Sequence, residues 1–458
     1  MIEVVQAFDR APIAQLEGDD AAALDRKLTA ARKVLADRGG WLQVHQRIAI
    51  LRKLAELMAG KREHFGQLIA REGGKPLTDA LIETDRAIDG VRNAADELRV
   101  MAGREIPMGL TPASTGRRAF TIVEPIGVVA AISAFNHPLN LIVHQVAPAV
   151  ATGCPVIIKP ANTTPLSCIE FVGLVHEAGL PPDWCQVFLP ETNELAEALA
   201  TDPRVAFLSF IGSSRVGWHL RSKLAPGTRC ALEHGGAAPV IIDRHADLYR
   251  LIEPLVKGGY YHAGQVCVSV QRIFVHADLQ REFVERFATR VAALRVGDPA
   301  LPETEMGPLI LPRETDRVLA WTGEAVEAGA RLIGGGRLSN TTLRPAILVE
   351  PPADAKVSTL EVFGPLTCVY PFTQLESAVA AANSLSTAFQ ASVFTEDLRT
   401  AFDVAERLDA STVLVNDHTA FRTDWMPFAG RRESGYGVGG IPWTMQEMTE
   451  EKMIVFRT

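Results

Sequence analysis

The stretch Val128-Val129-Ala130-Ala131-Ile132-Ser133 is short and almost wholly apolar, and Pro155-Val156-Ile157-Ile158-Lys159 repeats this texture after a segment of helical length. Further apolar runs follow at residues 184–189, 205–210 and 240–242. Short buried strands that alternate with helix-length segments are typical of a parallel α/β sheet. We therefore expect such a sheet in this part of the chain.

The regions on either side have a different texture. Near the N-terminus, apolar residues at three- and four-residue spacing predict helices at residues 24–35, 47–58, 61–71 and 81–101, with a break at Gly73-Gly74-Lys75-Pro76. Residues 117–123 alternate like an exposed or edge strand, and residues 451–456 are typical of a last strand. Between them we expect a second α/β region, with helices at 282–296 and 314–329 and strands at 270–275, 343–348, 369–372, 391–394 and 412–415.

Length and composition exclude several classes of protein. A chain of 458 residues predicts about two or three domains. The net charge of −8 gives no basic surface for nucleic acid. Six cysteines without Cys-x-x-Cys spacing argue against a disulfide framework and a metal site, and favour a reducing compartment. No signal peptide is visible, and the longest apolar run, residues 126–135, falls short of the roughly 18 residues of a membrane span. We expect a cytoplasmic protein without nucleic-acid or membrane partners.

Three residues carry the parts needed for covalent chemistry on a carbonyl. Cys267 in Gly264-Gln265-Val266-Cys267 can be a packed core cysteine or a nucleophile, since free cysteine is among the most buried residue types. Glu233 can be a surface carboxylate or a general base, and Asn136, before Pro138, can be a turn residue or an oxyanion donor. Thiol, carboxylate and amide together favour the catalytic interpretation.

Two motifs are candidates for binding a nucleotide. The run Gly212-Ser213-Ser214-Arg215-Val216-Gly217 follows an expected strand and opens a helix, so it can present N–H groups to a phosphate or can be a tight turn. Lys159 ends a buried strand, where ligands bind in parallel sheets, although it can also be a lysine that reaches for solvent.

In this order, these pieces resemble the NAD(P)-dependent aldehyde dehydrogenase superfamily over nearly the whole chain. The resemblance is closest to the branch with phosphonoacetaldehyde, lactaldehyde and non-phosphorylating glyceraldehyde-3-phosphate dehydrogenases, and residues 416–428 are most similar to the phosphonoacetaldehyde enzymes. It rests on an ordered set of motifs: Phe135-Asn136-His137-Pro138, Lys159-Pro160-Ala161-Asn162-Thr163-Thr164-Pro165, Phe210-Ile211-Gly212-Ser213, Leu232-Glu233-His234-Gly235-Gly236, Gly264-Gln265-Val266-Cys267, Glu361-Val362-Phe363-Gly364-Pro365 and Pro427-Phe428-Ala429-Gly430.

The resemblance implies an α/β fold with a Rossmann-type cofactor domain at residues 1–105 and 126–234. It also implies an α/β catalytic domain at 235–436 and a β oligomerisation arm at 106–125 and 437–458, which would make a homodimer or homotetramer. Cys267 is then the nucleophile that forms a thioester, Asn136 holds the oxyanion and Glu233 activates water. The cofactor, NAD or NADP, is expected on Lys159, Asn162, Gly212, Ser213, Gly217, Glu361 and Phe363.

Three positions depart from the family pattern. Asn162 stands where a ribose-binding glutamate is usual, and without that negative charge a 2′-phosphate meets no repulsion, so NADP can bind. Ile211 stands where threonine is common, which removes a hydroxyl near the nicotinamide. His234 replaces a common leucine and has no assigned role.

By the same resemblance, residues after Asn136 line the substrate funnel, and here they are polar. A polar funnel suits a short, polar, anionic aldehyde, with phosphonoacetaldehyde as the first choice, better than an alkyl chain. For Arg422 the alternative is a salt bridge to Asp424 or Asp417 that locks its loop. A CoA-acylating semialdehyde dehydrogenase and a non-catalytic relative are the competing functions, and Glu233 and the complete catalytic set argue against them. The expected substrate residues are His137, Asn140, His144, Arg86, His418, Phe421 and Arg422.

Overall fold

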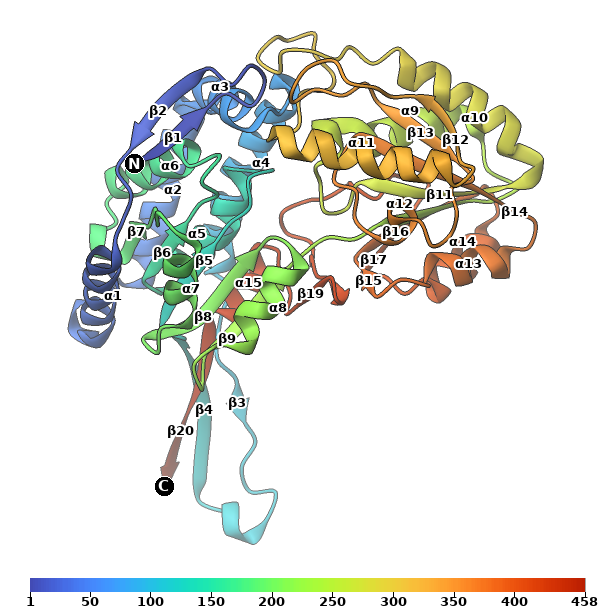
Figure 1. The fold of residues 1–458 in the computed structure, drawn as a ribbon. Coiled ribbons are helices and arrows are strands. Elements are labelled where there is room, and N and C mark those ends of the chain that lie inside the picture. The colour runs from blue at the N-terminus through green and yellow to red at the C-terminus, as the bar shows by residue number, and fades with distance from the viewer. Residues whose placement is uncertain (458) are drawn as a thin grey trace.

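The computed structural model describes residues 1–457, which form two α/β lobes and a long β arm (Figure 1). The first lobe contains a six-stranded sheet in the order β19-β9-β8-β5-β6-β7, parallel except at β19. Its strands are β5 (Val128–Ile132), β6 (Val156–Lys159), β7 (Cys185–Val187), β8 (Val205–Ile211), β9 (Arg229–Glu233) and β19 (Gly435–Tyr436).

Helices cover both faces of this sheet. Two apolar cores result, one on each face, because alternate strand residues point to opposite sides of a sheet. The helices are α1 (Ala21–Ala36), α2 (Val44–Gly60), α3 (Arg62–Gly73), α4 (Leu77–Glu97), α5 (Asn140–Thr152), α6 (Leu166–Glu177), α7 (Asn193–Thr201), α8 (Ser214–Ser222) and α15 (Ile441–Glu447).

The second lobe contains a seven-stranded sheet in the order β12-β13-β14-β11-β10-β16-β17, parallel except at β12. Its strands are β10 (Ala238–Ile242), β11 (Val270–His276), β12 (Arg331–Gly334), β13 (Ala346–Val349), β14 (Leu366–Phe372), β16 (Gln390–Phe394) and β17 (Thr412–Val415). Its helices are α9 (Leu248–Tyr260), α10 (Ala277–Ala292), α11 (Pro312–Glu327), α12 (Lys356–Thr359), α13 (Leu375–Ala382) and α14 (Leu398–Arg407).

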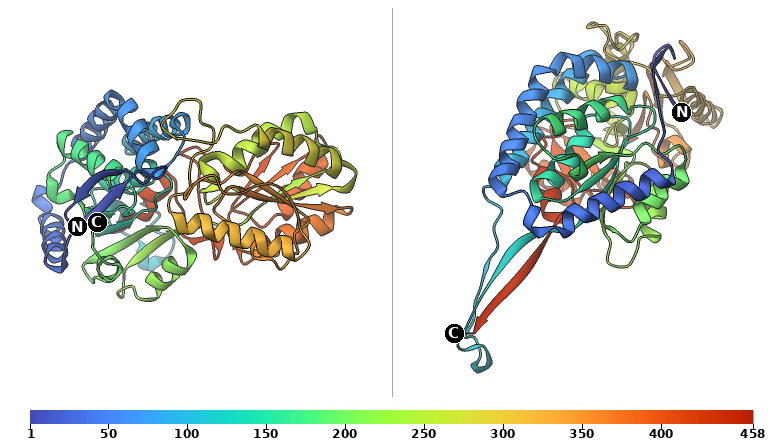
Figure 2. Two further views of the ribbon diagram at one scale, coloured as in Figure 1. Left: turned by 45° about the horizontal axis from the view of Figure 1, so that its top comes forward. Right: turned by 90° about the vertical axis from the view of Figure 1, so that its left-hand side faces the viewer.

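An antiparallel sheet of three strands projects away from the lobes and carries the C-terminus (Figures 1 and 2). In it β4 (Arg117–Pro125) lies between β20 (Thr449–Arg457) and β3 (Glu105–Ile106). Two small ribbons, β1 (Ile2–Val5) with β2 (Pro12–Leu16) and β15 (Thr387–Ala388) with β18 (Arg431–Arg432), complete the strands. The 3₁₀ turns lie at Arg38–Gly40, Pro112–Ser114, Pro182–Trp184 and Tyr261–Gly264.

The parallel α/β sheet predicted from residues 128–210 is confirmed, as are the four N-terminal helices and the break at Gly74, which is the left-handed C-cap of α3. One expectation was wrong and one holds in part. The strand at 240–242, expected in the first sheet, is β10, which pairs with β11 and β16 in the second sheet. Residues 117–123, expected as an exposed or edge strand, lie in β4, whose Arg118 and Phe120 are exposed, but β4 is the central strand of the arm sheet and not an edge. Neither the β1–β2 ribbon nor β9 was predicted.

The two sheets meet at opposite ends of their strands. Asn136, Lys159 and Glu233 lie at the carboxyl ends of β5, β6 and β9 in the first sheet. Cys267 lies just before the amino end of β11 in the second sheet. Ligands bind at the carboxyl edge of parallel sheets, so this junction is the natural place for a site.

Candidate active site

The site residues predicted in the first lobe lie at neighbouring strand ends, along the carboxyl edge of the first sheet. Ile132 of β5 pairs with Lys159 of β6, and Ile211 of β8 pairs with Glu233 of β9. The Ser133 N–H donates to the Lys159 carbonyl and the Gly212 N–H to the Glu233 carbonyl. The backbone therefore fixes the strand ends that carry these residues relative to one another.

The loop that carries Cys267 is strained and held from both sides. His262 and Ala263, in the 3₁₀ turn before it, have positive φ angles of 51° and 53°, which is uncommon for residues other than glycine and clusters at functional sites. The buried Gln265 side chain bonds to the backbone of Pro308 and Ile310. Asn136 Nδ2 donates to the Gln265 carbonyl at 3.0 Å. The expected oxyanion donor thus lies two residues from the expected nucleophile.

The half-buried Cys267 thiol shares its surroundings with two carboxylates and one cation. Burial raises its pKa to about 12, with Glu361 adding to the rise and Arg422 opposing it. Burial also raises the pKa of Glu233, and Arg422 again opposes the rise. Cys267, Glu233, Glu361 and Arg422 therefore form one electrostatic cluster, as perturbed groups at active sites do.

Each of the two carboxylates lies beside a glycine. Any side chain in place of that glycine would push the carboxylate away. A Cβ on Gly439 would come within 2.0 Å of Glu233 Oε1, and a Cβ on Gly235 within 1.8 Å of Glu361 Oε1. Gly439 is bound to Phe428 by two backbone hydrogen bonds. These glycines give the two carboxylates room to face Cys267.

The residues expected to hold the nucleotide offer unpaired polar groups, so they fit such a ligand. Within residues 1–457, Lys159 is half-buried without a hydrogen-bond partner, and burial lowers its pKa to about 8. Glu361 Oε1 is buried and unpaired in the described chain. At the α8 N-terminus, Ser213 makes no side-chain cap, which leaves backbone N–H groups available to a phosphate. Asn162 is exposed.

His234 has a packing role. Its ring lies against Gly217, where a Cβ would come within 2.0 Å of Cε1, and beside Phe210 and Trp218. Its Nδ1 bonds to the Gly212 carbonyl at 2.9 Å. His234 therefore fixes α8 and the glycine turn against the sheet.

Phe363, which has a φ of 46°, packs edge-on against Phe135, with 5.9 Å between the two ring centroids.

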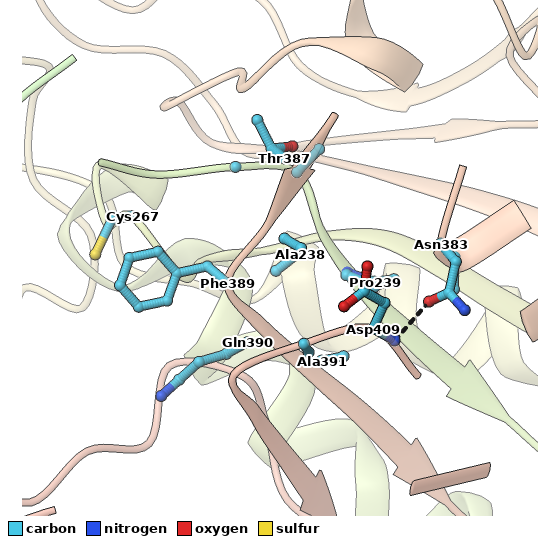
Figure 3. Close-up of a pocket in the computed structure, with 14 residues that line it drawn as sticks. Ala238, Pro239, Cys267, Asn383, Thr387, Phe389, Gln390, Ala391 and Asp409 are labelled. Carbon is cyan, nitrogen blue, oxygen red and sulfur yellow. Dashed lines mark hydrogen bonds between the residues drawn. The ribbon is translucent and has the colours of Figure 1, made fainter. Parts of the chain in front are cut away.

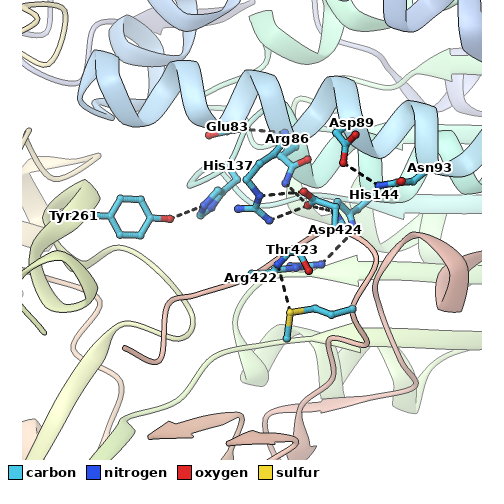
Figure 4. Close-up of polar contacts among 12 residues, drawn as sticks. Glu83, Arg86, Asp89, Asn93, His137, His144, Tyr261, Arg422, Thr423 and Asp424 are labelled. Atoms are coloured by element: carbon cyan, nitrogen blue, oxygen red, sulfur yellow. Dashed lines mark hydrogen bonds and ion pairs between the residues drawn. The ribbon is translucent and has the colours of Figure 1, made fainter. Parts of the chain in front are cut away.

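The expected substrate residues converge on a carboxylate that was not expected to organise the site. Asp424, 2% exposed, accepts two hydrogen bonds from the Arg86 guanidinium, at 2.8 and 3.1 Å. Asn140 Nδ2 donates to it at 3.0 Å and His144 Nε2 at 2.7 Å (Figure 4). Arg86, Asn140 and His144 thus each give at least one donor to Asp424.

Arg422 is held differently. The expected alternative, a salt bridge to Asp424 or Asp417, is wrong for the described residues, because Asp424 pairs with Arg86. Arg422 Nη2 donates to His144 Nδ1 at 3.2 Å, and its guanidinium stacks on Phe428 at 3.6 Å. Its Nε is buried without a partner in residues 1–457. Arg422 is therefore a cation that stacks on an aromatic ring and has an N–H donor, on Nε, without an acceptor in the described residues.

The remaining predicted substrate residues lie around this cluster. His137 Nε2 bonds to the Tyr261 hydroxyl at 2.8 Å, and burial holds the pKa of His137 well below its usual value. His418 packs against Gly258 at the end of α9, and Phe421 is exposed. The sequence interpretation placed Asp424 in the loop at the funnel, as an alternative partner of Arg422, but did not predict that Arg86, Asn140 and His144 all bond to it. Tyr261 was missed as a site residue.

A separate small pocket reaches Cys267 (Figure 3). Small residues such as Ala238 and Ala391 line it, and Asn383 accepts a hydrogen bond from the Asp409 N–H at 2.9 Å. None of His137, Asn140, His144 and Arg422 lines it, so it is distinct from the polar funnel.

All six cysteines are free thiols. Within residues 1–457, no group of three or more His, Cys, Asp or Glu side chains is arranged to hold a metal ion. No helix in the described part of the chain is long and apolar enough to cross a membrane.

The chain is similar to known proteins over nearly its whole length. The sequence model of the aldehyde dehydrogenase family matches residues 1–454. A 3-sulfolactaldehyde dehydrogenase of Priestia aryabhattai is 34% identical over 99% of this chain and 94% of its own length. The crystal structure of aldehyde dehydrogenase 21 from Physcomitrella patens in complex with the reaction product succinate superposes with a TM-score of 0.96 at 32% identity, covering 100% of this chain and 95% of that one.

A second solved structure extends the match. The glyceraldehyde-3-phosphate dehydrogenase GapN from Methanocaldococcus jannaschii, complexed with NADP, superposes with a TM-score of 0.95 at 30% identity, over 100% of this chain and 99% of that one. Since the family's sequence model and these whole-length matches both cover the chain almost from end to end, it belongs to the aldehyde dehydrogenase family.

Proposed function

We propose that this NAD(P)-dependent aldehyde dehydrogenase oxidises a short aldehyde with an anionic tail to its carboxylate. One observation carries the proposal: the Arg422 guanidinium is buried in the electrostatic cluster of Cys267 and Glu233, and its Nε has no partner in the described residues. A buried donor without a partner is costly, so it favours a ligand that supplies an acceptor. An anionic group two or three bonds from the aldehyde carbon would supply it.

In the first chemical step the Cys267 thiolate attacks the aldehyde carbon. Glu233 takes the thiol proton, which moves a charge within the site and does not create a new one. The S–C bond forms, and the carbonyl oxygen becomes an oxyanion. Asn136 Nδ2, which has a second hydrogen beyond the one given to Gln265, and the Cys267 backbone N–H donate to that oxygen.

The collapse of the oxyanion re-forms the C=O bond and leaves a thioester on Cys267. When bound, NAD(P)⁺ would supply the acceptor for the hydride that leaves the same carbon. We assign the adenosine ribose to Lys159 and Asn162 and the pyrophosphate to Gly212 and Ser213; Glu361 and Phe363 would hold the nicotinamide ribose. Gly217, also expected on the cofactor, is covered by the His234 ring and gives its N–H to the Ser213 carbonyl, so its contribution is to let this turn pack closely.

Water completes the cycle. Glu233, after giving its first proton to solvent, takes a proton from water, and the resulting hydroxide attacks the thioester carbon. The C–S bond breaks and the thiolate of Cys267 leaves, which restores the enzyme and releases the carboxylate. The buried position of Glu233 and its raised pKa suit such a base. A CoA-acylating enzyme would not need it, and the complete set of Cys267, Asn136 and Glu233 argues against a non-catalytic relative.

Among anionic aldehydes, phosphonoacetaldehyde is the candidate that the sequence resemblance suggests. The similar proteins named for 3-sulfolactaldehyde and glyceraldehyde 3-phosphate add two candidates that share the short chain and the anionic tail. Lactaldehyde, for which a related dehydrogenase of Methanocaldococcus jannaschii is named, is the neutral alternative.

A substrate panel tests the proposal. We expect kcat/KM for these anionic aldehydes to exceed that for lactaldehyde, hexanal and benzaldehyde, and Arg422→Gln to reduce it by a factor of about 10–100 while propanal is little affected. Arg422→Lys, which keeps the charge but loses the stacked plane, is the matched control and should fall between. If hexanal or benzaldehyde is the best substrate, the proposal is wrong; if CoA is acylated in place of hydrolysis, the CoA alternative holds.

We also propose that the chain is a cytoplasmic homodimer or homotetramer built through the arm. We propose a cofactor domain of residues 1–105 and 126–234, a catalytic domain of residues 235–436, and an arm of residues 106–125 and 437–458. Ile441 and Met445 of α15 fall within the arm by these bounds but pack into the first lobe. The arm exposes apolar side chains that a second chain would cover, namely Phe120, Met453, Val455 and Phe456. Light scattering that gives a monomer would contradict this.

A further inference from the structure

The funnel contains several charged side chains, and most of them are already paired with a side chain of opposite charge. Arg86 and Asp424 form a buried two-point ion pair. Behind His137, Lys75 and Glu83 form a second buried pair. Such pairs leave no net charge for a ligand.

The two histidines add no charge. Arg422 can only donate to His144 Nδ1, so that atom carries a lone pair, and the ring hydrogen is on Nε2, which donates to Asp424. A second ring proton would point at the guanidinium. His137 is buried and faces Tyr261, Lys75 and Arg86, which keep it neutral.

One unmatched positive charge therefore remains, on Arg422. Glu233 and Glu361 lie in the same cluster, and whenever either of them is ionised it makes a further negative charge in the site less favourable. A substrate tail with one negative charge would be matched by Arg422, whereas a tail with two would leave one charge buried and unpaired.

We infer that Asp424, by neutralising Arg86, makes this enzyme prefer aldehydes whose tail carries one negative charge, namely a sulfonate or a carboxylate. Aldehydes with a doubly charged phosphonate or phosphate tail are disfavoured. This inference rests on the proposed function, since it requires that Arg422 binds the tail. Asp424 acts through Arg86 and His144 and is a positioning residue.

The test uses the full-length enzyme and the matched series OHC–CH₂–X, in which X is sulfonate, carboxylate or phosphonate. At pH 8.5, where the phosphonate carries two charges, we expect kcat/KM for the sulfonate to exceed that for the phosphonate by about tenfold or more, which is the effect of about 1.4 kcal/mol. At pH 5.5, where the phosphonate carries one charge, the ratio should fall to within about threefold. Taking the ratio at each pH cancels the pH dependence of the enzyme itself, and the better of sulfonate and carboxylate identifies the tail.

A substitution then tests Asp424 directly. Asp424→Asn keeps the shape but frees the Arg86 charge, so the phosphonate-to-sulfonate ratio at pH 8.5 should rise by about tenfold or more. Asp89→Asn makes the same charge change on α4, the helix that carries Arg86, at a carboxylate bonded to Asn93, and should leave the ratio unchanged.

The outcomes separate the two proposals. If propanal surpasses all three anionic aldehydes, the proposed function fails. If the anionic aldehydes win but the phosphonate equals or exceeds the sulfonate at pH 8.5, the proposed function stands and the charge restriction is overturned. The wild-type comparison decides this even if Asp424→Asn does not fold.

Discussion

The imidazole of His144 lies between Asp424 and Arg422 and hydrogen-bonds to both, at 2.7 and 3.2 Å. This arrangement keeps the carboxylate and the guanidinium from forming a direct ion pair. It works only while the ring is neutral, because a protonated ring would turn a second N–H towards Arg422. Burial and Arg422 accordingly lower the pKa of His144 to about 4.

The first prediction concerns stability at acid pH. Because the pKa of His144 is about 4 in the folded protein and about 6.5 when unfolded, the unfolded chain binds the extra proton between these values, so stability falls as pH decreases through this window. Between pH 7.5 and 5.0 this group should cost about 2 kcal/mol. We expect His144→Gln to lose less stability over that interval than the wild type, as measured by urea unfolding at both pH values. Other buried histidines, such as His262, contribute equally to both proteins. Identical pH dependence would contradict the assignment.

The second prediction concerns the reactivity of Cys267. Its pKa of about 12 leaves little thiolate at neutral pH, so alkylation by iodoacetamide should be slow and should accelerate about tenfold per pH unit between pH 7 and 9. Glu361 raises this pKa and Arg422 lowers it. Glu361→Gln should therefore speed alkylation and Arg422→Gln should slow it, as followed by mass spectrometry of the Cys267 peptide. Opposite signs for the two variants are the decisive feature, since a general loosening of the fold would speed both.

Much of this candidate site could be predicted from the sequence because Asn136 and Lys159 lie at the carboxyl ends of predicted strands. Val128 to Ile132 predicts a strand, and whatever comes after it lies at the carboxyl edge of the sheet, which placed Asn136 correctly. The apolar run at 240–242 also predicts a strand, but an apolar run does not state which sheet it joins. The strand β9 was missed because its apolar run is short, from Cys230 to Leu232, and is bounded by the charged residues Arg229 and Glu233.

The Asp424 hub could not be deduced in the same way. Arg86 and Asp424 are 338 residues apart, and no local pattern relates them. The sequence does show that Arg422 and Asp424 are near neighbours, which favours a pair between them; in the structure Arg86 from α4 occupies both oxygens of that carboxylate and excludes it. Which arginine pairs with the buried Asp424 carboxylate is therefore decided by Arg86, a residue far away in the sequence.

The third prediction concerns the oxyanion. Asn136 is 5% exposed and already gives one hydrogen to Gln265, so its other hydrogen is aimed by a fixed amide. We expect Asn136→Ala to lower kcat by about 10²–10³ with little change in KM. Asn136→Asp, which keeps the shape but offers no hydrogen when ionised, should be equally poor. A variant that loses KM but retains kcat would show that Asn136 binds substrate and does not stabilise the oxyanion.

The fourth prediction concerns the choice of cofactor. Asn162 is exposed next to the strand end that carries Lys159, and neither side chain places a negative charge there. Asn162→Glu should therefore lower kcat/KM for NADP⁺ by about tenfold or more, because its carboxylate would repel a 2′-phosphate, while NAD⁺ is little affected. Asn162→Gln controls for the longer side chain and should leave the NADP⁺/NAD⁺ ratio unchanged. An unchanged ratio in Asn162→Glu would place the ribose elsewhere.

The last prediction separates the two halves of the reaction at Glu233. If Glu233 activates water, Glu233→Gln should still form the thioester, although more slowly because it no longer takes the thiol proton, and should then stop. Single-turnover experiments should show about one NAD(P)H per active site, and intact mass spectrometry should show the acyl group on Cys267. Gly439→Ala provides an independent approach, because the added Cβ would meet Glu233 Oε1 and push that carboxylate away. It should show the same accumulation in weaker form, whereas steady turnover by both variants without an acylated intermediate would remove Glu233 from the hydrolytic step.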